Sequence, residues 1–370
     1  SFKFKNYKLT PKVTPEHRKF FAKRLVNKTD IQNHLEAFNR DVESEEASKR
    51  LYYGNPGAGK SHIILHVGDY LKSRGFEVVY LECPPLKPRD MPIRLFKEFL
   101  EKVSMRRVID VLDKSYDRIM QETSQDPEIT DYHRDPIGKA YPRLMKEFES
   151  ESLITMVSKY ITVETEHIQI QRWLMGEKIK DVPVENLTEG TTTLSQVFVT
   201  LLKLLSKDDN KKLVLIFDEL HQMQEVDTHS APQFTLLFRD LVDDIQTHAA
   251  VILCYSASTL TSEEGAGEII NEHVRRRILD SNIIEIKEIK QQELEAFSSD
   301  LIKFNRAKDD SFYEEQCTKY QNETAGEKLV PELYPFTDES IQKLKTAMAQ
   351  AKPGEIIKAL NDSCSEAKSQ

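Results

Sequence analysis

Short apolar runs bounded by polar or glycine-containing segments recur along this chain. The runs "LVLIF" at 213–217 and "AAVILC" at 249–254 are too short for helices and indicate buried strands. Two further strands are predicted at 50–54 ("RLYYG") and 76–83 ("FEVVYLEC"). A helical stretch that ends near Gly75 separates these two, so the segment predicts one βαβ unit.

Residues 86–190 interrupt this alternation. Apolar side chains recur there with a helical period in two stretches, at 91–122 and at 141–161. The intervening residues 123–139 ("TSQDPEITDYHRDPIGK") carry the residue types typical of turns and loops. We therefore expect a helical insertion within an α/β core.

Helical patterns also flank the core. A short amphipathic helix is predicted at 27–42, after a basic arm at 1–23 in which aromatic residues are interleaved. This arm is read as an edge strand or ordered arm, with contact to nucleic acid as the alternative. The chain from about 268 onward is predicted to be mostly helical. Three domains are expected, which are an arm and helix at 1–48, a core at 49–267 and a helical lid at 268–370.

Composition supports a globular protein without membrane spans. Hydrophobic residues make up 39% and charged residues 31% of the chain, and the formal net charge is -9. The apolar runs fall far short of the roughly 20 residues of a spanning helix. Cys83, Cys254, Cys317 and Cys364 are scattered, which favours a reducing compartment and a cytoplasmic location over a disulfide framework or a zinc site. The acidic balance argues against a chain that simply coats nucleic acid.

The segment "GNPGAGKSH" matches the phosphate-loop pattern G-x-x-x-x-G-K-[ST] between a predicted strand and a predicted helix. Its glycines allow backbone N–H groups to approach phosphate, and the positive end of the helix dipole points to the same place. The pattern assigns the β- and γ-phosphates to Lys60 and a Mg²⁺ ligand to Ser61. The expected ATP or ADP site comprises Gly54, Asn55, Pro56, Gly57, Ala58, Gly59, Lys60, Ser61 and His62.

A second predicted part of the site follows the buried strand in "LVLIFDELH". Asp218 at the end of this strand is expected to hold the metal's water shell, and Glu219 to orient and polarise the attacking water. A phosphate loop alone binds nucleotide, whereas a loop combined with this glutamate is equipped to hydrolyse it. Ser256, at the end of the strand "AAVILCYS", is expected to touch the γ-phosphate or the water.

These motifs together resemble the AAA+ ATPases, in the branch of origin-recognition-type initiators, transposition-regulator ATPases and ATP-binding proteins of BREX-like defence systems. The resemblance rests on "GNPGAGKS", "LIFDELH", "YSAS" and "NEHVRRRILD" at 271–280. It implies that Arg277, with Arg276 and Arg275 as the alternatives, reaches the nucleotide of a neighbouring subunit, and hence a homo-oligomer. It also implies that Val26 lies in an element that cups the adenine, and that the partner is DNA or a DNA-bound protein.

Two features depart from that family. Ile357 occupies the place in "KPGEIIKAL" where the lid usually carries an arginine. The separation of Lys60 from Asp218 is far longer than a compact AAA+ core needs, which makes the insertion a subfamily feature.

Four functions are compatible with these motifs. The leading hypothesis is an oligomerising ATPase that assembles on, or remodels, DNA or a partner complex. The alternative is a STAND-type nucleotide switch with slow turnover. "DELH" followed by "SAS" also mimics DEAH-type helicases, but too few residues follow for a second motor domain. A small-molecule kinase would use the same loop, yet no acceptor site is recognisable.

Overall fold

The computed structural model divides the chain into two compact units. One, here called the sheet unit, comprises 33–53 and 67–284, and the other, the lid unit, comprises 54–66 and 285–370 together with 1–32. The residues described are 28–43, 49–83, 91–180, 182–208, 212–220, 231–244, 249–257, 272–304, 315, 318, 338–347, 350–351, 355–360 and 362.

A five-stranded parallel sheet forms the core, in the order β2-β3-β4-β1-β5. Its strands are β1 (Lys49–Gly54), β2 (Glu77–Glu82), β3 (Leu213–Asp218), β4 (Ala249–Ser256) and β5 (Ile283–Glu285). Every residue of β3 is buried, as expected for a strand covered on both faces. β4 lies between β3 and β1, so the two predicted halves of the site follow strands that are not neighbours.

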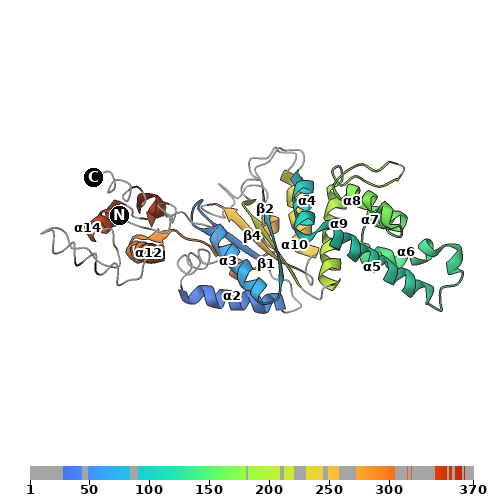
Figure 1. Ribbon diagram of the computed structural model, residues 1–370, viewed down its shortest axis with the longest axis horizontal. Coiled ribbons are helices and arrows are strands. Elements are labelled where there is room, and N and C mark those ends of the chain that lie inside the picture. Colours follow the sequence, from blue (N-terminus) through green and yellow to red (C-terminus); the bar gives the residue numbers. More distant parts are fainter. Residues whose placement is uncertain are drawn as a thin grey trace. The chain divides into compact units, whose positions relative to one another are not determined.

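Helices cover both faces of this sheet (Figure 1). On one face, Gly68 of α3 (Lys60–Ser73) lies against Ile216 and Val78, where the absence of a side chain permits close packing. On the other face, the Phe217 ring packs edge-on against Phe238 of α10 (Ala231–Asp244). α4 (Met91–Val103) and α9 (Thr191–Asp208) also contact strands of the sheet. The predicted α/β fold, a parallel sheet with helices on both faces, is confirmed.

The insertion is helical, as predicted. After α4 it contains α5 (Met105–Ser124), η1 (Tyr132–Arg134), α6 (Pro136–Phe148), α7 (Glu151–Tyr160), η2 (Glu164–Glu166) and α8 (His167–Leu174). The loop predicted at 123–139 is shorter in the structure, because α5 runs to Ser124 and α6 begins at Pro136, where the Asp135 side chain caps it. Trp173 is fully buried, and its indole Nε1 donates to the Glu185 carbonyl at 3.0 Å.

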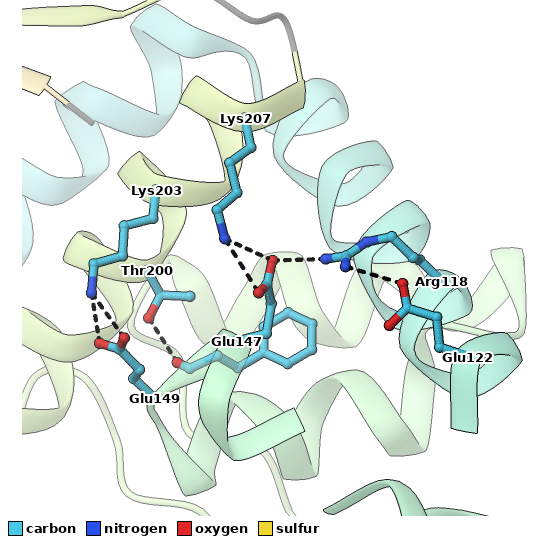
Figure 2. A network of polar contacts seen from close by, with 8 residues as sticks. Arg118, Glu122, Glu147, Glu149, Thr200, Lys203 and Lys207 are labelled. Carbon is cyan, nitrogen blue, oxygen red and sulfur yellow. Dashed lines mark hydrogen bonds and ion pairs between the residues drawn. The ribbon is translucent and has the colours of Figure 1, made fainter. Parts of the chain in front are cut away.

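A polar network ties the insertion to α9 (Figure 2). Lys203 of α9 pairs at 2.8 Å with Glu149, which directly follows α6. Lys207 of α9 pairs at 3.2 Å with Glu147, in the last turn of α6. The buried Thr200 hydroxyl donates to the Phe148 carbonyl at 2.7 Å. Exposed pairs stabilise little, so we attribute the fixed position of α6 chiefly to the buried hydrogen bond and the surrounding core.

The lid unit has its own apolar core. It contains β6 (Ile289–Lys290), α12 (Gln291–Phe304), α14 (Asp338–Ala347) and β7 (Gln350–Ala351), and β6 pairs antiparallel with β7. Ile357 is 5% exposed in this core, whereas its neighbour Lys358 is exposed. Ile357 is therefore a packing residue of the lid. The short strands β5, β6 and β7 lie in a region whose pattern predicts mostly helices.

Candidate nucleotide site

The predicted phosphate loop connects β1, which ends at Gly54, to α3, which begins at Lys60. Gly57 and Gly59 have φ values of 82° and 96°, a region that other residues rarely adopt. The Ala58 amide donates to the Asn55 carbonyl at 3.1 Å and closes the turn. The glycines of the motif therefore stand where the backbone requires them.

Lys60 lies inside this loop. It is only 7% exposed, and its ammonium donates to the carbonyls of Gly54 at 3.0 Å and of Asn55 at 2.9 Å. The charge is thus held at the first residue of α3, where the helix dipole is also positive. Ser61 and His62 follow in the first turn and are half-buried, while Pro56 is exposed.

The loop also contacts a segment far away in the sequence, within the same unit. A Cβ added to Gly54 would lie 2.3 Å from the carbonyl oxygen of Ile286, closer than real Cβ contacts come. The Asn55 amide Nδ2 donates to Glu288 Oε1 at 2.9 Å. Gly54 is therefore needed for this backbone approach, a reason that the phosphate-loop pattern alone does not reveal.

Asp218 lies at the carboxyl end of β3, and β2 and β4 run parallel to β3, so Glu82 and Ser256 end at the same edge. The Asp218 side chain is nearly fully buried, at 2% exposure. Its Oδ1 accepts from the Glu219 amide at 2.8 Å, and its Oδ2 accepts from the Tyr80 hydroxyl at 2.6 Å. Both oxygens of this buried carboxylate therefore have a donor, as a buried charge requires.

Glu219 directly follows the strand in a left-handed conformation, with φ of 57°. This conformation costs a residue other than glycine roughly 1–2 kcal/mol. Such strain in native structures gathers at functional sites, where the position of a side chain matters more than local stability. The observation marks Glu219 as a functional candidate independently of the motif.

The carboxyl edge of the sheet is rich in negative charge. Burial raises the pKa of the Cys83 thiol well above its usual range, and the nearby carboxylates of Glu98, Asp218 and Glu219 raise it further. Burial also raises the pKa of Glu98. A thiol in this setting stays protonated, and a cation would be stabilised at this edge.

Ser256 is the last residue of β4 and is half-buried. Leu253 pairs with Phe217, so continuation of this register places Ser256 on the same face of the sheet as Asp218. This face is also the one that Gly68 of α3 covers.

Arg277 lies at the opposite edge. It follows α11 (Glu272–Arg275), and its Nε donates to the Asp243 carboxylate near the end of α10. α10 returns the chain from the carboxyl edge of β3 to the amino edge of β4, which places Asp243 at the amino edge. Burial lowers the pKa of Lys49, the first residue of β1, and the Asp243 carboxylate, which lies near it, opposes that shift.

Val26 and the basic arm at 1–23 lie outside the described residues. Within the described ranges, no three His, Cys, Asp or Glu side chains are arranged to hold a metal ion. A Mg²⁺ site built from one carboxylate, one hydroxyl and phosphate oxygens would not require such a group. Among the described helices, none has both the length and the apolar character needed to cross a membrane.

Tyr80 is the residue of this region that the motifs do not identify. It lies opposite Ile216 in the β2–β3 register and reaches Asp218 two residues further along β3. The only sequence signal is a tyrosine near the end of an otherwise apolar strand pattern. That signal is also typical of a packing residue.

No protein-family model matches this chain, and no curated protein matches it either. Solved structures similar to it include a Walker-type ATPase of Pyrococcus abyssi, which is 14% identical with a TM-score of 0.38 and alignment over 95% of this chain and 69% of that one. The Orc1 protein of Aeropyrum pernix, solved in complex with DNA, is 10% identical with a TM-score of 0.40 over 93% and 69% of the two chains. Cdc6p of Pyrobaculum aerophilum is 9% identical with a TM-score of 0.36 over 78% and 54%.

Proposed function

We propose that this chain is an AAA+ ATPase that binds ATP, hydrolyses it with Mg²⁺ and acts as a homo-oligomer on DNA or a DNA-bound protein partner. The observation that carries the proposal is the pair Asp218 and Glu219. One is a buried, doubly hydrogen-bonded carboxylate at the end of a core strand, and the other is held in a strained conformation directly after it.

Phosphate binding is assigned to the loop at 54–61. Its glycines adopt backbone conformations with positive φ and carry no side chain that would keep phosphate away from the backbone N–H groups. The first turn of α3 contributes the positive end of the helix dipole. The Lys60 ammonium donates to two carbonyls of this loop. On nucleotide binding, we expect it to exchange those neutral acceptors for phosphate oxygens, which form stronger, charge-assisted hydrogen bonds.

The donor set fits a magnesium ion. Ser61 would supply a hydroxyl and Asp218 a carboxylate, and hard oxygen ligands of this kind are what Mg²⁺ takes beside phosphate oxygens and water. The bound ion would neutralise part of the negative charge on the phosphates. Asp218 would hold water of the metal shell through the lone pairs that its two donors leave unused.

Hydrolysis needs a positioned water, which we assign to Glu219. Its carboxylate would accept a hydrogen bond from the water and polarise it towards the γ-phosphate. Ser256 lies on the same sheet face as Asp218 and would touch the γ-phosphate or the water. The left-handed backbone at Glu219 sets the direction in which its side chain leaves the strand end, and a carboxylate that positions a water needs such a fixed direction.

Arg277 is proposed to act in trans. Its position at the amino edge of the sheet separates it from Asp218 of the same chain, and an arginine supplied by a neighbour stabilises charge on a transferring phosphoryl group. Turnover would then depend on assembly. The partner class, DNA or a DNA-bound protein, is what the resemblance of the four motifs to AAA+ proteins implies, and the basic residues at 1–23 are the sequence feature suited to contact DNA.

Steady-state ATP hydrolysis at several protein concentrations, with and without double-stranded DNA at low salt, tests the whole proposal. We expect turnover per subunit to rise with concentration and to rise again with DNA. Lys60→Ala serves as the control and should abolish nucleotide binding. Undiminished affinity in that variant would refute the phosphate-loop assignment. Flat, DNA-independent turnover would favour the STAND-type switch or an ATPase directed to a protein partner.

A further inference from the structure

Tyr80 and Asp218 are joined across two neighbouring strands of the sheet unit. Tyr80 pairs with Ile216, and Glu82 pairs with Asp218, so Tyr80 and Asp218 are diagonal neighbours on one face. That diagonal is within reach of a long aromatic side chain but not of a short one. The Tyr80 hydroxyl ends 2.6 Å from Asp218 Oδ2.

This hydrogen bond restricts the rotation of the carboxylate. The Glu219 amide holds Oδ1 at 2.8 Å and Tyr80 holds Oδ2, so the two donors together determine how the carboxylate plane lies. An oxygen of an ionised carboxylate accepts more than one hydrogen bond, so each retains capacity for a further donor. Without Tyr80, only the amide of the adjacent residue would orient the group.

The strand that carries Tyr80 also limits the movement of its hydroxyl. The Tyr80 ring is half-buried in β2, a rigid element, which keeps the hydroxyl in place.

We infer that Tyr80 is a positioning residue, which directs the Asp218 carboxylate towards the metal of a Mg²⁺–nucleotide complex. The inference rests on the proposed function. Metal binding at Asp218 would then depend on Tyr80 of the neighbouring strand β2, a residue outside every motif. Residues that hydrogen-bond to a metal ligand and orient it typically contribute roughly 10–100-fold to metal affinity or activity.

The test uses Tyr80→Phe, which removes the hydroxyl and keeps the ring. A fluorescent, non-hydrolysable ATP analogue is titrated with Mg²⁺, and Mn²⁺ bound to the protein–analogue complex is measured by electron paramagnetic resonance. We expect the metal concentration for half-saturation to rise on the order of 10-fold, with metal-free analogue affinity unchanged. Tyr116→Phe, which removes a buried tyrosine hydroxyl from α5 of the insertion, should leave both quantities at the wild-type value.

A double-mutant cycle shows whether Tyr80 acts through Asp218. In an Asp218→Asn background, Tyr80→Phe should produce little further change in the metal response, because residues that share one interaction are not additive. A metal midpoint within about twofold of wild type in Tyr80→Phe would overturn the inference. So would an equal loss of analogue affinity with and without metal, since that would indicate a loosened sheet.

The failure of the proposed function would look different. Wild-type protein that binds the analogue equally well with and without metal would refute the Mg²⁺–nucleotide assignment itself. A wild-type metal response that Tyr80→Phe leaves in place would refute only the role of Tyr80.

Discussion

Arg277 donates to Asp243 at the amino edge of the sheet, whereas Asp218 ends β3 at the carboxyl edge. β3 rises about 3.3 Å per residue, so its ends lie roughly 16 Å apart. An arginine side chain does not span this length. The separation supports the proposal that Arg277 serves the nucleotide of a neighbouring subunit.

Replacement of Arg277 by alanine should therefore spare ATP binding and lower turnover per subunit. We expect a loss of at least about 10³-fold at saturating ATP, the lower range for an arginine that stabilises a phosphoryl-transfer transition state. Binding of a fluorescent ATP analogue and steady-state hydrolysis check the two parts. Arg239→Ala, which removes an exposed arginine of α10, is the matched control.

Mixing variants tests the trans arrangement directly. Arg277→Ala subunits retain Glu219, and Glu219→Gln subunits retain Arg277, so interfaces that combine them contain one complete site. We expect activity to reappear on mixing, with a maximum at an intermediate ratio. The absence of recovery at every ratio would contradict action in trans.

Glu219→Gly and Glu219→Ala should both stop turnover but differ in stability. Each loses the water-orienting carboxylate, at a cost on the order of 10²-fold or more in kcat. Glycine accepts the φ of 57° without a Cβ penalty, so Glu219→Gly should be about 1 kcal/mol more stable to urea than Glu219→Ala. Equal stability of the two variants would show that the left-handed backbone is not retained in solution.

Gly54→Ala should be more damaging than Gly75→Ala. Both glycines have positive φ, but a Cβ at Gly75 meets nothing within 4 Å, whereas one at Gly54 meets the Ile286 carbonyl oxygen at 2.3 Å. We expect Gly75→Ala to cost about 1 kcal/mol and to keep nucleotide affinity. Gly54→Ala should lose affinity because the loop must shift, and calorimetric titration with ATP compares the two.

Thr200→Val should loosen the attachment of α6 to α9. The change leaves the buried Phe148 carbonyl without its 2.7 Å donor, a loss of about 1–3 kcal/mol. Lys203→Ala breaks the partly exposed pair with Glu149 and should cost less than about 1 kcal/mol. Urea unfolding followed by the fluorescence of Trp173, the single tryptophan, reports on the insertion.

The phosphate loop and the acidic strand end were predictable because their information is local. A motif of contiguous residues specifies where Gly54, Lys60 and Ser61 stand, and the apolar run before Asp218 identifies a buried strand. The helical insertion was predictable for the same reason, since its apolar period lies within continuous stretches. The short strands β5 to β7 were not, because two or three residues carry no measurable period.

The sequence by itself determined the type of core, its helical insertion and the residues expected to hold a nucleotide. Only the tertiary structure decided that β4 separates β3 from β1, that Arg277 and Asp218 lie at different edges of the sheet, and that the Tyr80 hydroxyl donates to the Asp218 carboxylate. Tyr80 and Asp218 are 138 positions apart. Their contact depends on strand order and register, which arise when distant segments pack together and which no local pattern contains.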